Sequence, residues 1–186
     1  MKIGVFGSNS RAVAIGRLLV DAGYQVCFGD AEDMKSAQSA AARAGAVADT
    51  PYNDAAVCEM LIFAGSREKV DDLLAQAGCI SPQAVVVDAM EGAPNDANGS
   101  ELLARKLDTH RVVRALIVLP QPGVNILYCG DDADAMTLVE EVFRTAGCVT
   151  TYRGPLANAA EITPPDTTST GEAEFQRIKS ANTVAS

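Results

Sequence analysis

The chain has 186 residues and a net charge of −9, with 15 Lys and Arg against 24 Asp and Glu. This length suits one domain with a sizeable core and leaves little room for a separate substrate domain. The basic residues are scattered, which argues against a nucleic-acid partner, and no apolar run is long enough to span a bilayer. The five cysteines stand singly without C-x-x-C spacing, which indicates reduced core residues in a cytoplasmic protein.

The first thirty residues predict a strand, a turn, a helix and a second strand. Residues 2–6 form a short apolar run, residues 12–22 place apolar side chains at helical spacing, and residues 24–28 again have strand character. Residues 7–11 are a polar turn that begins with glycine. Dinucleotides bind at the first turn of such a βαβ unit, because the N–H groups and the dipole of the helix face the pyrophosphate.

Strands and helices continue to alternate along the chain. We predict helices at 33–44, 70–77, 100–107 and 132–146, strands at 59–64, 84–88, 112–119, 124–129 and 148–152, and a short strand and a short helix at 46–48 and 52–58. This pattern predicts an α/β protein with a doubly wound, mainly parallel sheet, the NAD(P)-binding Rossmann fold, over residues 1–160. A shift to Thr, Ser, Pro and charge predicts a C-terminal tail over 161–186, partly ordered or with a short helix.

Loops at the carboxyl ends of parallel strands hold the ligand in this architecture. The predicted cofactor-binding residues are those of the glycine turn, the acidic residue after the second strand and the loops after two later strands: Gly7, Ser8, Asn9, Ser10, Arg11, Asp30, Ala64, Gly65, Ser66 and Ala89. We expect the loops at 64–67 and 89–95 to border the nicotinamide. The sequence identifies no catalytic residue, and the acidic run at 131–134 indicates a helix cap rather than a metal site.

Five segments resemble one known family, the deazaflavin-dependent NADP oxidoreductases (coenzyme F-420 reductases) and their dinucleotide-binding relatives. They are residues 2–7, 21–24, 112–116, 129–132 and, as the most specific, Gly154-Pro155-Leu156-Ala157-Asn158. The similarity covers roughly residues 1–160. It implies a compact Rossmann domain in which NADP and a deazaflavin meet for hydride transfer, chemistry that needs positioning more than acid or base residues.

The glycine turn departs from the G-x-G-x-x-G pattern of that family. Gly7 is kept, but Asn9 stands at the second glycine position and Ala12 at the third. Alanine is tolerated at the third position. Asn9 is expected to crowd the pyrophosphate, so that glycine there should tighten binding, while Ser8, Ser10 and Arg11 compensate in part as phosphate donors.

A second departure concerns the choice between NAD and NADP. The family commonly has Ser-Arg after the second strand to bind the 2′-phosphate, whereas this chain has Asp30 and Ala31. A carboxylate accepts hydrogen bonds from a free ribose hydroxyl and repels a 2′-phosphate, so NAD is favoured over NADP. The alternative, that Asp30 only caps the following helix, carries equal weight.

Two functions are compatible with these features. The first is an NAD(P)-dependent oxidoreductase that transfers hydride between the dinucleotide and a deazaflavin, a flavin or a small-molecule acceptor. The second is a non-catalytic nucleotide-binding or interaction module with a degenerate fingerprint. We prefer the first, with a possible deazaflavin cofactor, a possible homodimer, and no nucleic-acid or membrane partner.

Overall fold

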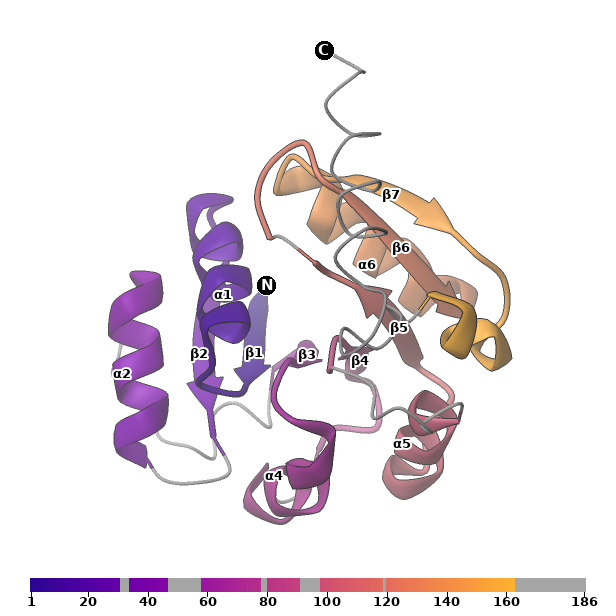
Figure 1. Ribbon diagram of the computed structural model, residues 1–186, viewed down its shortest axis with the longest axis horizontal. Helices are drawn as coiled ribbons and strands as arrows, with labels where there is room; N and C mark the ends of the chain where they lie inside the picture. The colour runs from indigo at the N-terminus through magenta and orange to yellow at the C-terminus, as the bar shows by residue number, and fades with distance from the viewer. Residues whose placement is uncertain (31–33, 47–57, 78–79, 91–97, 119, 163–186) are drawn as a thin grey trace, which may run out of the picture.

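The computed structural model describes residues 1–30, 34–46, 58–77, 80–90, 98–118 and 120–162, which form one sheet with helices on both faces (Figure 1). In chain order the elements are β1 (Lys2–Phe6), α1 (Ser10–Asp21), β2 (Gln25–Gly29), α2 (Met34–Ala44), β3 (Met60–Phe63), the 3-10 helix η1 (Arg67–Lys69), α4 (Val70–Ala77), β4 (Val85–Asp88), α5 (Gly99–Leu107), β5 (Val112–Leu116), β6 (Asn125–Gly130), α6 (Ala133–Thr145), β7 (Val149–Tyr152) and the 3-10 helix η2 (Leu156–Ile162).

The sheet has seven strands in the order β2-β1-β3-β4-β5-β6-β7. The strands β1 to β5 are all parallel, which confirms the predicted doubly wound architecture. β6 pairs antiparallel with β5, with Leu116 opposite Leu127, and β7 is parallel to β6. The reversal follows from the short connection between β5 and β6, because a parallel return needs a crossover of a dozen or more residues.

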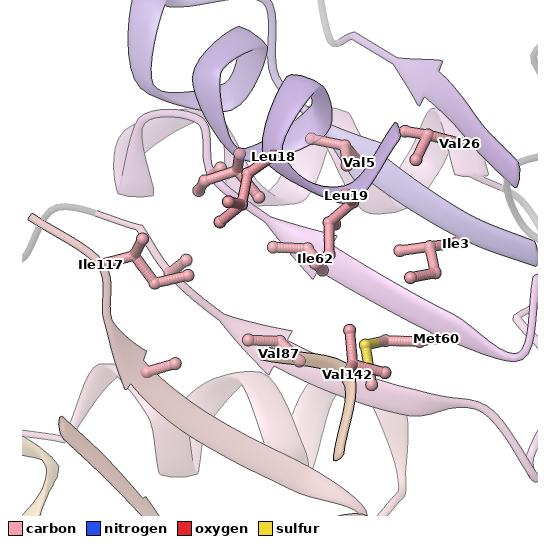
Figure 2. Packing of buried hydrophobic residues seen from close by; sticks show 14 of the residues in the cluster. Ile3, Val5, Leu18, Leu19, Val26, Met60, Ile62, Val87, Ile117 and Val142 are labelled. Atoms are coloured by element: carbon pink, nitrogen blue, oxygen red, sulfur yellow. The ribbon is translucent and has the colours of Figure 1, made fainter. Parts of the chain in front are cut away.

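Each face of the sheet has its own hydrophobic cluster. One cluster packs α1, α2 and α6 against the sheet, and the other packs α4, α5 and η2 against the opposite face. Figure 2 shows Leu18 and Leu19 of α1 in the same cluster as Val5 of β1 and Ile62 of β3. The apolar spacing along α1 that predicted a helix is therefore the spacing of the side chains that the sheet buries.

The predicted elements agree with the described ones to within a few residues, except that β5 ends earlier than expected. The strand at 46–48 and the helix at 52–58 lie almost entirely outside the described residues, as does the tail from residue 163. The described structure continues through η2 to Ile162, and the domain boundary at residue 160 stays a prediction. In the part of the chain that the structure describes, no helix has the length and apolar character of a membrane span.

Candidate functional site

The glycine turn joins β1 to α1 and lies against the loop after β3. Gly7 has φ of +131°, a conformation that favours glycine, and its N–H donates to the carbonyl of Gly29 at 2.8 Å. A Cβ added at Gly7 would lie 2.9 Å from the backbone N of Gly65. Both the backbone conformation and this close approach therefore require glycine at position 7.

Asn9 is the N-cap of α1 and also ties the turn to the next strand of the sheet. Its Oδ1 accepts from the N–H of Ala12 at 2.8 Å, and its Nδ2 donates to the carbonyl of Ala64 at 2.9 Å. The side chain that replaces the second glycine of the fingerprint thus stabilises the turn, a role that the sequence did not reveal. Removing it would break both bonds.

The start of α1 has the features of an anion-binding site. The first turn of the helix carries Ser10 and Arg11 and no acidic residue, and N–H groups at a helix start are available to a ligand. Ala12, at the third fingerprint position, is fully buried. In the fingerprint, the third glycine allows the helix to pack closely against the strand. In this chain the close approach occurs at Gly16, where a Cβ would overlap the ring of Phe28 in β2. These residues fit a pyrophosphate at the N-terminus of α1.

Asp30 follows β2 and lies beside the same turn. It is the residue after Gly29, whose carbonyl accepts from Gly7, and it is only 5% exposed. This position is compatible with both readings of Asp30, because residues 31–33, which precede α2, lie outside the described part of the chain. Ribose recognition and helix capping therefore both stay predictions.

The loops after β3 and β4 complete this edge of the sheet. The N–H of Ala64 donates to the carbonyl of Phe6 at 2.9 Å, and the N–H of Ala89 donates to the carbonyl of Phe63 at 2.8 Å. Both loops thus begin level with the glycine turn. All ten predicted cofactor-binding residues lie at the carboxyl ends of the adjacent strands β2, β1, β3 and β4. The remainder of the loop expected at 89–95, from residue 91, lies outside the described residues.

A buried charged cluster that was not expected from the sequence lies under these two loops. Asp88, the last residue of β4, is fully buried, and its carboxylate accepts from Arg67 at 2.8 Å, from Ser100 Oγ at 2.6 Å and from the N–H of Met90 at 3.1 Å. Arg114 of β5 donates to the Asp88 carboxylate at 3.3 Å and to the carbonyl of Met90 at 2.7 Å. We call these five residues the Asp88 cluster.

The Asp88 cluster fixes both loops to the sheet. Arg67 begins η1, directly after the loop that follows β3, and Met90 belongs to the loop after β4. The carboxylate of Asp88 is fully buried and paired with both Arg67 and Arg114, so losing a partner there is costly. The sequence did contain a signal for this cluster, namely charged residues within apolar strands. Arg114 lies inside Val112–Leu116, and Asp88 is the last residue of Val85–Asp88. Such residues are rarely buried unless they are paired.

The sequence of the N-terminal half matches a known family. Residues 2–92 match the family model described as coenzyme F420-dependent NADP oxidoreductase, which confirms the resemblance stated above. Among curated proteins, none matches the chain. The matched region includes every predicted cofactor-binding residue.

Several solved structures share the fold. A hypothetical protein of Sinorhizobium meliloti has a TM-score of 0.73 at 19% identity, with 88% of this chain and 89% of that chain covered. A protein of Arthrobacter sp. FB24, provisionally assigned as an F420-dependent NADP reductase, has a TM-score of 0.69 at 18% identity, with 97% and 94% covered. An imine reductase variant from Myxococcus stipitatus, in complex with NAD+, has the same TM-score and identity, but this chain covers only 61% of it.

Proposed function

We propose that this chain is an oxidoreductase that binds a nicotinamide dinucleotide at the carboxyl ends of β2, β1, β3 and β4, because residues 2–92 match the coenzyme F420-dependent NADP oxidoreductases. The acceptor or donor of the hydride would be a deazaflavin, a flavin or a small molecule such as an imine. The observation that carries the proposal is the glycine turn, in which Gly7 lies against Gly65 and α1 begins without an acidic residue.

The residues of the turn would hold the pyrophosphate. The N–H groups of Ser10 and Arg11 belong to the first turn of α1, and the hydroxyl groups of Ser8 and Ser10 are further donors. The positive end of the helix dipole adds to this attraction. Asn9 contributes indirectly, since it fixes the turn by its bonds to Ala12 and Ala64.

Asp30 would select the dinucleotide. Its carboxylate accepts hydrogen bonds from the free ribose hydroxyl of NAD, whereas a 2′-phosphate would be repelled by like charge. Asp30 lies directly after Gly29, which contacts the glycine turn, so the position suits the ribose next to the pyrophosphate. We therefore propose NAD rather than NADP as the preferred cofactor.

Hydride transfer itself is the chemistry of the nicotinamide and its acceptor, and the protein supplies binding and orientation. The loops that begin at Ala64 and Ala89 would border the nicotinamide. The Asp88 cluster acts below them as a positioning group, because Arg67 and Met90 are held through the same carboxylate. A small displacement of the loops would misalign the reacting atoms, which costs rate steeply.

The test is a calorimetric titration with NAD, NADP and deazaflavin, repeated on two variants of the exposed residue Ser10. Ser10→Glu places a negative charge in the first turn of α1, where it stabilises the helix by about 0.3–1 kcal/mol but repels a pyrophosphate. We expect this variant to remain folded and to lose at least about tenfold in NAD affinity, a loss of about 1.4 kcal/mol. Ser10→Gln is the neutral control and should retain most of the affinity.

The same protein preparations distinguish the two functions considered for this chain. Oxidation of reduced dinucleotide by deazaflavin, flavin or imine would support the oxidoreductase. Binding of NAD without turnover by any of these acceptors would favour a nucleotide-binding module. Absence of NAD and NADP binding by the folded wild type would contradict the oxidoreductase and would favour an interaction module that binds no dinucleotide.

A further inference from the structure

Two cysteines that are far apart in sequence meet in the core below the candidate site. The Sγ atoms of Cys27 in β2 and Cys58 before β3 lie 3.2 Å apart, within hydrogen-bonding distance. Each residue is 1% exposed, and both belong to the cluster that packs α4 and α5 against the sheet. Closing this contact to a disulfide bond of about 2.05 Å requires the sulfur atoms to approach by only about 1.1 Å.

The sheet explains why the two thiols can meet across β1. Cys27 is paired in register with Gly4 of β1, and the chain bends at Cys58 before it enters β3 on the other side of β1. Residues paired in a sheet point to the same face, so a side chain at position 4 would occupy the face on which Cys27 lies. Glycine at position 4 leaves that face of β1 open to the sulfur atoms.

We propose that Cys27 and Cys58 are a redox-active pair that hydrogen peroxide oxidises to an intramolecular disulfide. One thiolate attacks the peroxide, so that an S–O bond forms, the O–O bond breaks and water is released after protonation. The second thiol then attacks the sulfenic sulfur, the S–S bond forms, and the S–O bond breaks with release of a second water. In sum, two thiols are oxidised, one peroxide is reduced to two waters, and a thiol reductant reverses the change.

The remaining described cysteines provide an internal comparison. Burial raises the pKa of Cys129 and of Cys148, so that both thiols are protonated at neutral pH. Cys148 donates its thiol to the backbone carbonyl of Gln121 at 3.7 Å rather than to a sulfur. Cys27 is at least as buried, and its thiol also donates to a backbone carbonyl, that of Ile3 at 3.6 Å. The feature that distinguishes Cys27 and Cys58 is therefore the 3.2 Å distance between their sulfur atoms, and we expect peroxide to link these two thiols but not to crosslink Cys148.

The bond would join β2 to the segment that enters β3, across β1. Cys27 precedes Asp30 by three residues, and the loop that the bond closes contains Asp30 and all of α2. A crosslink restricts the unfolded chain and so favours the folded form. Oxidation should therefore stabilise the part of the fold that presents Asp30.

The test is peroxide treatment of the native full-length protein, followed by alkylation, trypsin digestion and mass spectrometry. Cleavage at Lys and Arg places Cys27 in peptide 18–35 and Cys58 in peptide 44–67, so the disulfide joins two separate peptides. We expect this crosslinked pair in monomeric protein, its loss on reduction, and a fall from five to three titratable thiols in denaturant. The oxidised protein should also unfold at a higher denaturant concentration than the reduced one.

Three variants serve as controls. Cys27→Ser and Cys58→Ser should each abolish the crosslink and the gain in stability, whereas Cys148→Ser should change neither. The proposal would be overturned if peroxide oxidised peptide 145–153, which carries Cys148, at a dose that leaves peptides 18–35 and 44–67 unlinked. A crosslink that forms only in urea-unfolded wild type would overturn it as well, and this measurement does not depend on how any variant folds.

Discussion

The side chain of Asn9 offers the sharpest test of how the glycine turn works. Its backbone is extended, with φ of −66° and ψ of 169°, a conformation open to any residue, so a substitution there tests the side chain and not the backbone. Replacing an Asn N-cap by Ala costs about 0.5–2 kcal/mol. Loss of the 2.9 Å bond to the carbonyl of Ala64 adds about 1 kcal/mol. Asn9→Ala should therefore lower the free energy of unfolding by about 1.5–3 kcal/mol.

Asn9→Gly distinguishes stabilisation of the glycine turn by the Asn9 side chain from the crowding of the pyrophosphate that we expected from the sequence. Glycine is nearly as good an N-cap as asparagine and costs only a few tenths of a kcal/mol, so the variant loses mainly the bond to Ala64. If the turn must be ordered before it binds a dinucleotide, that loss of about 1 kcal/mol should weaken NAD binding about fivefold. If the side chain instead crowds the pyrophosphate, the same variant should bind NAD more tightly.

Urea unfolding and calorimetry with NAD measure the two effects on the same proteins. Ser10→Ala is the control for stability, because it changes the next residue but leaves both bonds of Asn9 intact, and its effect should stay within about 0.5 kcal/mol. A several-fold gain in NAD affinity for Asn9→Gly would refute the idea that the Asn9 side chain orders the glycine turn for binding. Unchanged stability of Asn9→Ala would show that the two hydrogen bonds contribute nothing to the fold.

Three further predictions concern the Asp88 cluster, a tyrosine and the cofactor. Asp88→Asn removes the buried carboxylate between two arginines and should lower the free energy of unfolding, measured in urea, by about 3–5 kcal/mol. The control Asp132→Asn keeps a cap on α6 and should cost about 1 kcal/mol or less. Equal losses in the two variants would contradict the stabilising role of the Asp88 cluster. Burial, and then Glu140, raises the pKa of Tyr128 in the folded protein. The free energy of unfolding should therefore fall as pH rises above about 10, and more steeply in wild type than in Tyr128→Phe. Parallel pH profiles of the two proteins would show that Tyr128 does not contribute to this loss of stability. Wild type should bind NAD at least about tenfold more tightly than NADP, and Ser and Arg in place of Asp30 and Ala31 should reverse this preference; equal wild-type affinities would indicate a helix cap.

The sequence predicted the order of strands and helices because each element carries its own local pattern. The apolar face of α1, the glycine that ends it and the strand that follows are all short-range features. The antiparallel pairing of β5 with β6 is not such a feature. It depends on how the connection after Leu116 turns back to Asn125, and strand periodicity is the same in either direction.

The candidate site was predicted in position but not in its internal contacts. The glycine turn and the loops at the strand ends follow from the βαβ pattern, and the structure places them at one edge of the sheet. The bond from Asn9 to Ala64 spans 55 positions, and the contact of Cys27 with Cys58 spans 31. Contacts of this kind depend on strand order and register, which periodicity alone does not specify. Asp88 and Arg114 could have been noticed as charges within apolar runs, although not as each other's partners.

Dinucleotide binding at the glycine turn is tested most directly by a crystal structure of the protein grown with saturating NAD. We expect electron density for the pyrophosphate at the N-terminus of α1, between Gly7 and Ala12, and for a ribose hydroxyl within hydrogen-bonding distance of the Asp30 carboxylate. The nicotinamide should lie between the loops that begin at Ala64 and Ala89. Dinucleotide density elsewhere on the protein, with the glycine turn well ordered and unoccupied, would contradict this expectation.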